Sequence, residues 1–129
     1  MFREDYIMRL VYEMVKTLLK LLFNINPDKN EELVFAEKEK QEKYEELMSL
    51  IDKGEINEAE NELLGGLDAA DIQCYKMALM FYSYLNEKDT DFLEEHDFSK
   101  SEIVEGLKYV SSVYGYESMA EALLDNISE

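Results

Sequence analysis

The 129-residue sequence contains few of the residues that reverse the direction of a chain: one proline and five glycines. Proteins built from many β-strands need such residues in their tight turns, so the shortage favours long helices. At the same time 47% of the residues are apolar, which at this length is enough to build one hydrophobic core. We therefore expect a single all-helical domain over residues 1–129.

Cysteine is almost absent. Cys74 is the only one, which excludes a disulfide within the chain and a zinc site built from several cysteines. Acidic Glu4 and Asp5 stand where a signal peptide has its basic start. The sequence also has no uninterrupted run of about 18 apolar residues, the length that a membrane helix needs. These absences predict a cytoplasmic protein without a membrane segment.

Basic residues are scarce: 13 Lys and Arg stand against 30 Asp and Glu, for a net charge of −17. Direct nucleic-acid binding needs a basic surface that neutralises phosphates, so we expect none. Residues 1–25 hold four basic and three acidic residues, a net charge of +1, whereas the rest hold nine and twenty-seven, a net charge of −18. Such a surface favours a basic protein partner.

Motifs of catalysis and of metal binding are missing as well. The sequence has no phosphate-binding glycine loop, no nucleophile elbow and no H-E-x-x-H zinc motif. The only histidine, His96, lies in an acidic stretch, and position 93, where a di-metal motif needs an acid, is leucine. Cys74 lies in an apolar run, where a thiol packs as a small hydrophobic group. We therefore expect no enzyme activity, cofactor or metal, and an exposed His96 without a role.

What the sequence does have is apolar residues at helical spacing. In residues 4–25, the predicted N-terminal helix, they recur at alternating steps of four and three, which is the seam of a coiled coil. The seam consists of Ile7, Val11, Met14, Leu18, Leu21 and Ile25. Further apolar residues widen this face until only a narrow polar stripe is left, so the helix needs partners on more than one side.

Three roles are open for this helix: insertion into a membrane surface, packing within the domain, and pairing with a second copy. Membrane insertion is disfavoured because the polar stripe is only weakly basic and the rest of the chain repels anionic lipid. Packing and pairing both remain open. We take the seam as the candidate interface of a homodimer.

Shorter helices are expected after this one. Pro27 should end the first helix, with Asn26 as the cap of the next. That helix is predicted from residue 28 to Lys53, either continuous or broken, with an almost wholly charged middle over residues 37–43 that projects past the core. The run over residues 72–85 has Lys76 as its only charge, so it should form the central helix.

Local signals predict where several of these helices begin and end. Gly54 should end one helix and Gly115 another. Asp68 is the expected cap of the central helix, and a short helical turn should follow Thr90. Ser99 has the spacing of a capping box with the acid three residues later, which opens a helix. A last helix should carry Met119, Ala120, Leu123, Leu124 and Ile127.

The two glycine turns lie in an internal repeat. Gly54, Ala59 and Leu63 have the same spacing as Gly115, Ala120 and Leu124, G-x4-A-x3-L. Residues 44–64 resemble a tetratricopeptide-type repeat, in which a glycine turn joins two helices. The predicted fold is therefore an all-α array of about five to seven helices, with tetratricopeptide-like hairpins over residues 44–129.

A second resemblance concerns the opening, MFREDYIMRLVYEM. Its D-Y-I-M-R stretch, Asp5 to Arg9, resembles the start of an uncharacterised family of short helical proteins from Gram-positive bacteria. This resemblance implies no activity and no functional residues.

The sequence thus predicts a non-catalytic cytoplasmic interaction or scaffolding module of unknown process, which self-associates through its N-terminal helix and binds a protein partner. The acidic surface favours a basic partner. The alternative is an acidic nucleic-acid mimic that occupies a nucleic-acid-binding protein. The nine tyrosines are expected to be packing residues whose hydroxyls reach the surface, or to line a binding groove.

Overall fold

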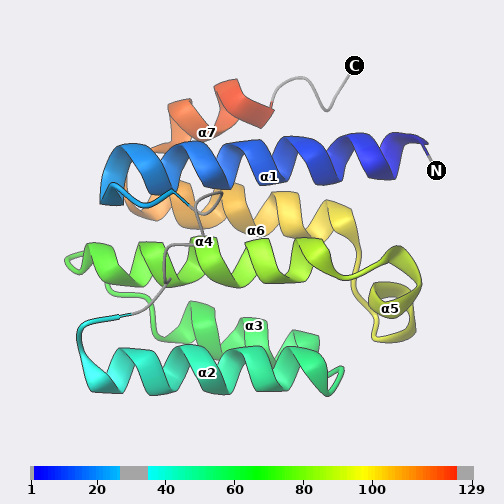
Figure 1. Ribbon diagram of the computed structural model, residues 1–129, viewed down its shortest axis with the longest axis horizontal. Helices are drawn as coiled ribbons and strands as arrows, with labels where there is room; N and C mark the ends of the chain where they lie inside the picture. Colours follow the sequence, from blue (N-terminus) through cyan, green and yellow to red (C-terminus); the bar gives the residue numbers. More distant parts are fainter. Residues whose placement is uncertain (1, 27–34, 125–129) are drawn as a thin grey trace.

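In a computed structural model that describes residues 2–26 and 35–124, the chain forms seven helices and no strand, which confirms the all-α prediction. The helices are α1 (Phe2–Phe23), α2 (Lys38–Asp52), α3 (Ile56–Gly65), α4 (Ile72–Glu87), α5 (Thr90–Glu95), α6 (Lys100–Val113) and α7 (Glu117–Leu124). Figure 1 shows the long helices lying side by side in one stack. None of the helices described is long and apolar enough to cross a membrane.

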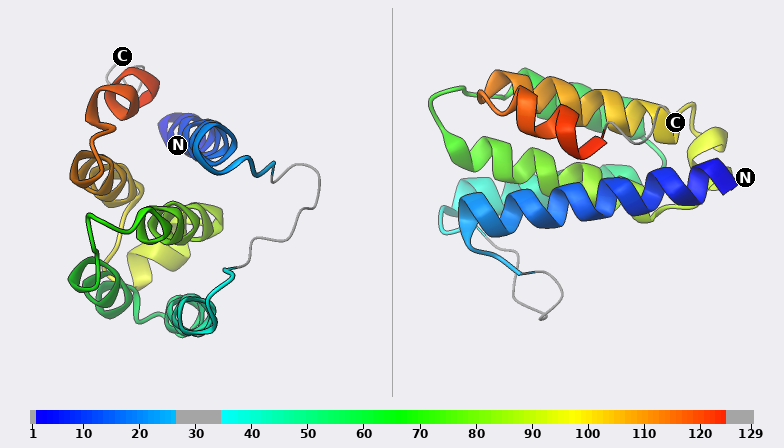
Figure 2. Two further views of the ribbon diagram at one scale, coloured as in Figure 1. Left: turned by 90° about the vertical axis from the view of Figure 1, so that its left-hand side faces the viewer. Right: turned by 90° about the horizontal axis from the view of Figure 1, so that it is seen from above.

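The apolar run over residues 72–85 forms the central helix, as predicted. Ten of the sixteen residues of α4 are buried, and α4 packs against α1, α2 and α6. Figure 2 shows these neighbours arranged around it. Because neighbours cover α4 on several sides, an almost uncharged sequence is what this position needs.

The second helix is shorter than predicted. It begins at Lys38, and residues 35–37 are not helical, so a continuous helix from residue 28 to 53 is wrong. Phe35 explains the break: its side chain is only 6% exposed, and its backbone N–H donates to the Gln41 side chain at 2.9 Å. The chain leaves the helical path to bury this ring. Residues 27–34, with the predicted Pro27 stop, lie outside the described part.

The charged run at the start of α2 does not project past the core. Lys40 forms an ion pair with Asp71 at 2.7 Å, and Lys43 one with Glu62 at the same distance. The first pair joins α2 to the start of α4, and the second joins it to α3. The charges therefore connect helices at the surface.

The internal repeat corresponds to two matching hairpins, α2–α3 and α6–α7. Gly54 and Gly115 both have positive φ, 84° and 82°, a conformation that favours glycine. In each turn the N–H of the residue after the glycine donates to the carbonyl oxygen five residues earlier, at 2.9 and 2.8 Å. Ala59 and Ala120 are both fully buried. The same local rules therefore build both hairpins.

One predicted cap is confirmed and another is wrong. Ser99 caps α6 and accepts a hydrogen bond from the backbone N–H of Glu102 at 3.3 Å. At α4 the cap is Asp71, which accepts from the N–H of Gln73 at 3.0 Å. Asp68 instead accepts from the N–H of Ala70 in the turn before. Because α4 begins at Ile72, Asp68 is too far from its first turn.

Candidate functional site

Most of the predicted interaction seam lies inside the chain. Four of its residues belong to the hydrophobic core: Ile7, Val11, Met14 and Leu18. Ile25 is partly buried and packs against the core, whereas Leu21 is 64% exposed. Side chains buried within one chain do not reach a second chain in this conformation. Self-association through α1 stays a prediction, but Leu21 is the part of the seam that a partner can readily contact.

A second stripe on α1 borders the open surface. Its residues recur at steps of three and four along the helix: Asp5, Met8, Tyr12, Val15 and Leu19. The last four each come directly after a residue of the seam. Met8 and Tyr12 are each 40% exposed, whereas Val15 and Leu19 are buried. The stripe therefore passes from the surface into the core along one side of α1.

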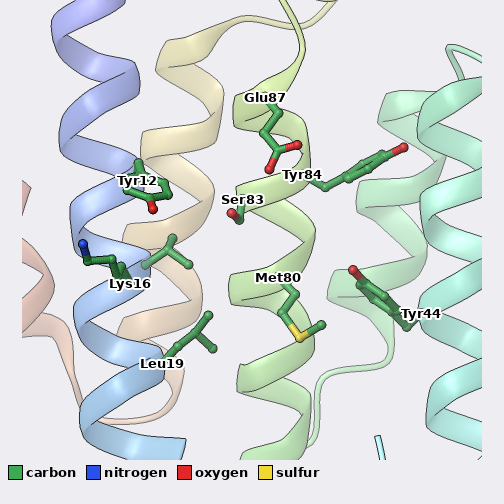
Figure 3. Close-up of a pocket in the computed structure, with 9 residues that line it drawn as sticks. Tyr12, Lys16, Leu19, Tyr44, Met80, Ser83, Tyr84 and Glu87 are labelled. Atoms are coloured by element: carbon green, nitrogen blue, oxygen red, sulfur yellow. The ribbon is translucent and has the colours of Figure 1, made fainter. Parts of the chain in front are cut away.

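Three residues of this stripe, Tyr12, Val15 and Leu19, line a hollow of about 120 Å³ between α1 and α4. The hollow is lined by Tyr12, Val15, Lys16, Leu19, Tyr44, Met80, Ser83, Tyr84 and Glu87. In Figure 3 Leu19 points from α1 toward α4, and Tyr44 reaches in from α2 with its hydroxyl toward α4. Aliphatic and sulfur-containing side chains thus meet three tyrosines in one place.

A second hollow, of about 440 Å³, adjoins the first and shares Tyr12 and Glu87 with it. Its other lining residues are Asp5, Met8, Arg9 and Asn86. We call the two hollows together the α1–α4 groove. The α1 stripe that borders it runs from Asp5 to Leu19, which at 1.5 Å per residue is roughly 21 Å of helix.

The Tyr84 side of the groove is held by a polar cluster. The Tyr84 hydroxyl donates to Asp52 Oδ1 at 2.6 Å, and Lys88 Nζ lies 2.8 Å from the same oxygen. The hydrogen bonds from Lys88 and Tyr84 hold the pKa of Asp52 below its ordinary value. Burial and the neighbouring Tyr84 raise the pKa of Tyr44, so its hydroxyl stays protonated at neutral pH.

Asn86 closes the other end of the groove. Its side chain is buried, and its Nδ2 donates to the carbonyl oxygen of Met8 at 2.9 Å. Its Oδ1 has no hydrogen-bond partner among the residues described. Lys100 Nζ donates to the backbone oxygen of Asn86 at 2.7 Å, so that ammonium group satisfies the main chain and not the amide.

The two residues considered for catalysis lie in different surroundings. His96 is half-buried and not exposed as predicted, because its ring packs against Gly54 and Phe92. Its Nδ1 lies 2.7 Å from the carbonyl oxygen of Phe92. Cys74 is half-buried near the start of α4. Within the described ranges, no three or more His, Cys, Asp or Glu residues are grouped to hold a metal ion.

The tyrosines serve both purposes that the sequence left open. Tyr75 is fully buried, and its hydroxyl lies 2.7 Å from Ser111 Oγ in a buried hydrogen bond. The prediction that the packing tyrosines reach the surface with their hydroxyls is therefore wrong for Tyr75. Tyr12, Tyr44 and Tyr84 line the groove. The groove itself was not predicted. The apolar residues next to the seam were the feature of the sequence that could have indicated it.

Residues 1–115 match the model of a family of unknown function, DUF6483. The chain belongs to this family. The DUF6483 match covers α1 to α6 and ends at Gly115, so it includes both walls of the groove and stops before α7. Neither curated proteins nor solved structures gave a match to this DUF6483 chain.

Proposed function

We propose that this chain is a non-catalytic protein-interaction module of the bacterial cytoplasm, which binds a helical segment of a partner protein in the α1–α4 groove. The observation that carries the proposal is the pair of adjoining hollows, walled by α1 and α4 and joined at Tyr12 and Glu87. Grooves between helices commonly receive the apolar face of an amphipathic helix.

The dimensions and lining of the groove suit such a ligand. A partner helix of about 14 residues has the same length as the stripe from Asp5 to Leu19. Its apolar side chains, at steps of three and four, would meet the partly exposed Met8 and Tyr12, and the buried Val15, Leu19 and Met80 form the floor beneath them. Tyrosine and methionine are enriched at interfaces, tyrosine because its large ring carries a polar hydroxyl and methionine because its flexible side chain adapts to a partner surface.

Photo-cross-linking in the native host tests this proposal. A benzophenone amino acid replaces Tyr12 in the groove, and in a matched variant it replaces Tyr109, which is 52% exposed on α6. We expect a defined adduct from position 12 that position 109 does not give, and its loss when Met8→Glu is added. Mass spectrometry should map the adduct to an amphipathic helical segment. Equal adducts from both positions, or none, would contradict the proposal.

Self-association through α1 is a second candidate function, supported by its exposed apolar side chains. Tyr6, Met8 and Tyr12 are each 40% exposed and Leu21 is 64% exposed. Since residues 1–25 carry a net charge of only +1, two copies of this helix repel each other less than other parts of the chain do. Light scattering after size exclusion should show a dimer that Leu21→Glu disrupts. A monomer at every concentration removes this candidate.

The nucleic-acid mimic has less support. A mimic presents free carboxylates along one face, whereas Asp52, Glu62 and Asp71 each form an ion pair with a lysine. Competition between the chain and DNA for the captured partner would distinguish the two functions. If the partner proves not to bind nucleic acid, the mimic is excluded.

A further inference from the structure

A polar stripe on α1 faces the solvent. It consists of Arg9, Glu13, Lys16 and Lys20, at steps of four, three and four, so at 3.6 residues per turn these side chains follow one line along the helix. Arg9, Glu13 and Lys20 are exposed, and Lys16 is half-buried. Figure 2 shows α1 at the outside of the helix assembly. The polar stripe therefore lies opposite the buried seam.

Exposed apolar side chains border the polar stripe on both sides. Met8 and Tyr12 lie on the side of the groove, and Tyr6 and Leu21 lie on the other side. A line of polar residues between two apolar borders is a surface along which a second helix can lie, because its own flanks then cover both borders.

The order of the charges along the polar stripe favours a second copy of α1 in one direction. In a parallel pair each residue faces its own copy, so like charges meet at every position of the stripe. In an antiparallel pair centred at Val11, Arg9 of each copy faces Glu13 of the other. Displacing one helix by a heptad brings Arg9 opposite Lys20 instead. The antiparallel pair centred at Val11 thus avoids the like-charge contacts of both alternatives.

The surroundings of these residues are compatible with such a pair. Within the chain Glu13 contacts Lys16 at 4.0 Å, which is longer than the 2.7 Å ion pairs of Lys40 and Lys43, and its side chain is still 56% exposed. The polar stripe has three basic residues and one acidic residue, whereas the whole chain has a net charge of −17. A second copy therefore meets less repulsion along α1 than along the acidic helices.

We propose that α1 pairs with α1 of a second copy in antiparallel orientation, with Arg9 of each copy opposite Glu13 of the other. This inference rests on the second candidate function, self-association through α1. A two-fold axis near Val11 relates the copies, so each contact occurs twice. The pair also covers the exposed side of Tyr12, which lines the groove. Dimer formation and the binding of a partner helix therefore compete for the same side chain.

Charge reversal on the intact chain tests this pairing. Arg9→Glu alone and Glu13→Arg alone each place like charges opposite each other twice, so each should raise the dissociation constant of the dimer about tenfold or more by sedimentation equilibrium. The double variant Arg9→Glu, Glu13→Arg restores opposite charges and should return to within about threefold of the wild type. An equimolar mixture of the two single variants should form a heterodimer for the same reason.

Two control variants change the net charge by the same amounts on another helix. Lys108→Glu matches Arg9→Glu, and Glu105→Arg matches Glu13→Arg. Both control positions are exposed on α6. Neither substitution should change the dissociation constant more than about threefold, because long-range repulsion between exposed charges is screened by salt. Recovery in the double variant excludes misfolding as the cause of the single effects.

The possible contrary results have different meanings. Equal effects of Arg9→Glu and Lys108→Glu overturn the antiparallel pairing and leave self-association standing. A weaker dimer with Arg9→Glu but a tighter one with Glu13→Arg shows that the polar stripe binds an acidic surface of the other copy, which also overturns the pairing. A wild-type monomer at every concentration removes both this inference and the second candidate function. The helix-binding groove is tested separately, by the cross-link at position 12.

Discussion

The ring of Tyr82 lies directly against Gly106, and this close approach joins the central helix to α6. A Cβ atom at position 106 would lie 2.3 Å from both Cζ and the hydroxyl oxygen of Tyr82. The ring is fully buried, and its hydroxyl donates to Glu60 Oε2 at 2.6 Å. Glycine is therefore needed here for the space that it leaves.

Gly106→Ala should lower the free energy of unfolding by about 1–3 kcal/mol, because a ring held by packing and by a hydrogen bond has little room to move. Gly65→Ala is the matched control. A Cβ there meets no atom of the described part of the chain within 4 Å, and alanine should stabilise the chain by up to about 1 kcal/mol. Urea denaturation measures both. Equal effects of the two substitutions would contradict the role given to the Tyr82 contact.

The two glycine turns predict unequal effects from the same substitution. Alanine at Gly54 or Gly115 must adopt a positive φ, which costs about 1–2 kcal/mol at either position. At Gly54 the new Cβ would also lie 2.2 Å from Cδ2 of His96, whereas at Gly115 no atom of the described residues lies within 4 Å. Gly54→Ala should therefore destabilise the chain more than Gly115→Ala does.

A double substitution tests the cause of that inequality. Starting from His96→Ala, the further change Gly54→Ala should cost about as much as Gly115→Ala in the wild type, because only the backbone cost is left. Thermal or urea unfolding of the four variants measures the coupling. If the cost at Gly54 is the same with and without the imidazole, the contact with His96 has no energetic effect.

Glu60 should make stability depend on pH in an unusual direction for an acid. Burial, more than any other cause, raises its pKa above the ordinary 4.5, with Glu102 adding to the rise and the Tyr82 hydrogen bond opposing it. The folded state thus binds the proton more tightly than the unfolded state, so this stabilising contribution is present at low pH. It is lost as the pH rises through the raised pKa.

Glu60→Gln removes this titration and keeps a side-chain oxygen that can accept from Tyr82. We expect the variant to gain stability relative to the wild type as the pH rises from about 4 to 7. Urea midpoints across that range give the comparison, with the exposed Glu105→Gln as the control. A constant difference between variant and wild type over the whole range would show that Glu60 titrates normally.

Asp52 should show the opposite shift. Lys88 and then Tyr84 lower its pKa below 3.8 by hydrogen bonding to its carboxylate, so its stabilising contribution is present above 3.8 and is lost as the pH falls through the lowered value. In Lys88→Met the pKa of Asp52, followed by NMR through the carboxyl carbon, should rise toward 3.8. Because this pair is exposed to solvent, we expect little change in stability. An unchanged pKa would contradict the ion pair.

Local sequence was sufficient for the features that depend on neighbouring residues alone. The glycines at 54 and 115, the Ser99 cap and the apolar run over residues 72–85 were all predicted, and the structure contains each of them. These features follow from backbone conformation, from a short-range hydrogen bond and from composition. None depends on what lies across the core.

Features decided by distant contacts could not be predicted in this way. Periodicity placed a broad apolar face on α1, but it did not show whether a second copy or the chain itself would cover each part. Packing against α4, α6 and α7 buried the seam residues Ile7, Val11, Met14 and Leu18 and left the flank at Met8 and Tyr12 partly open. Likewise, the burial of Phe35 accompanies a start of α2 at Lys38, whereas the local sequence favoured helix through residues 35–37 as well.

The residues of the sequence therefore determined the helices, their turns and most of their ends, because those depend on interactions within a few positions. Only the tertiary structure decided which side of α1 is covered and where a groove remains. The physical reason is that burial depends on how all the helices pack together. A helix with apolar residues on two flanks can bury either flank.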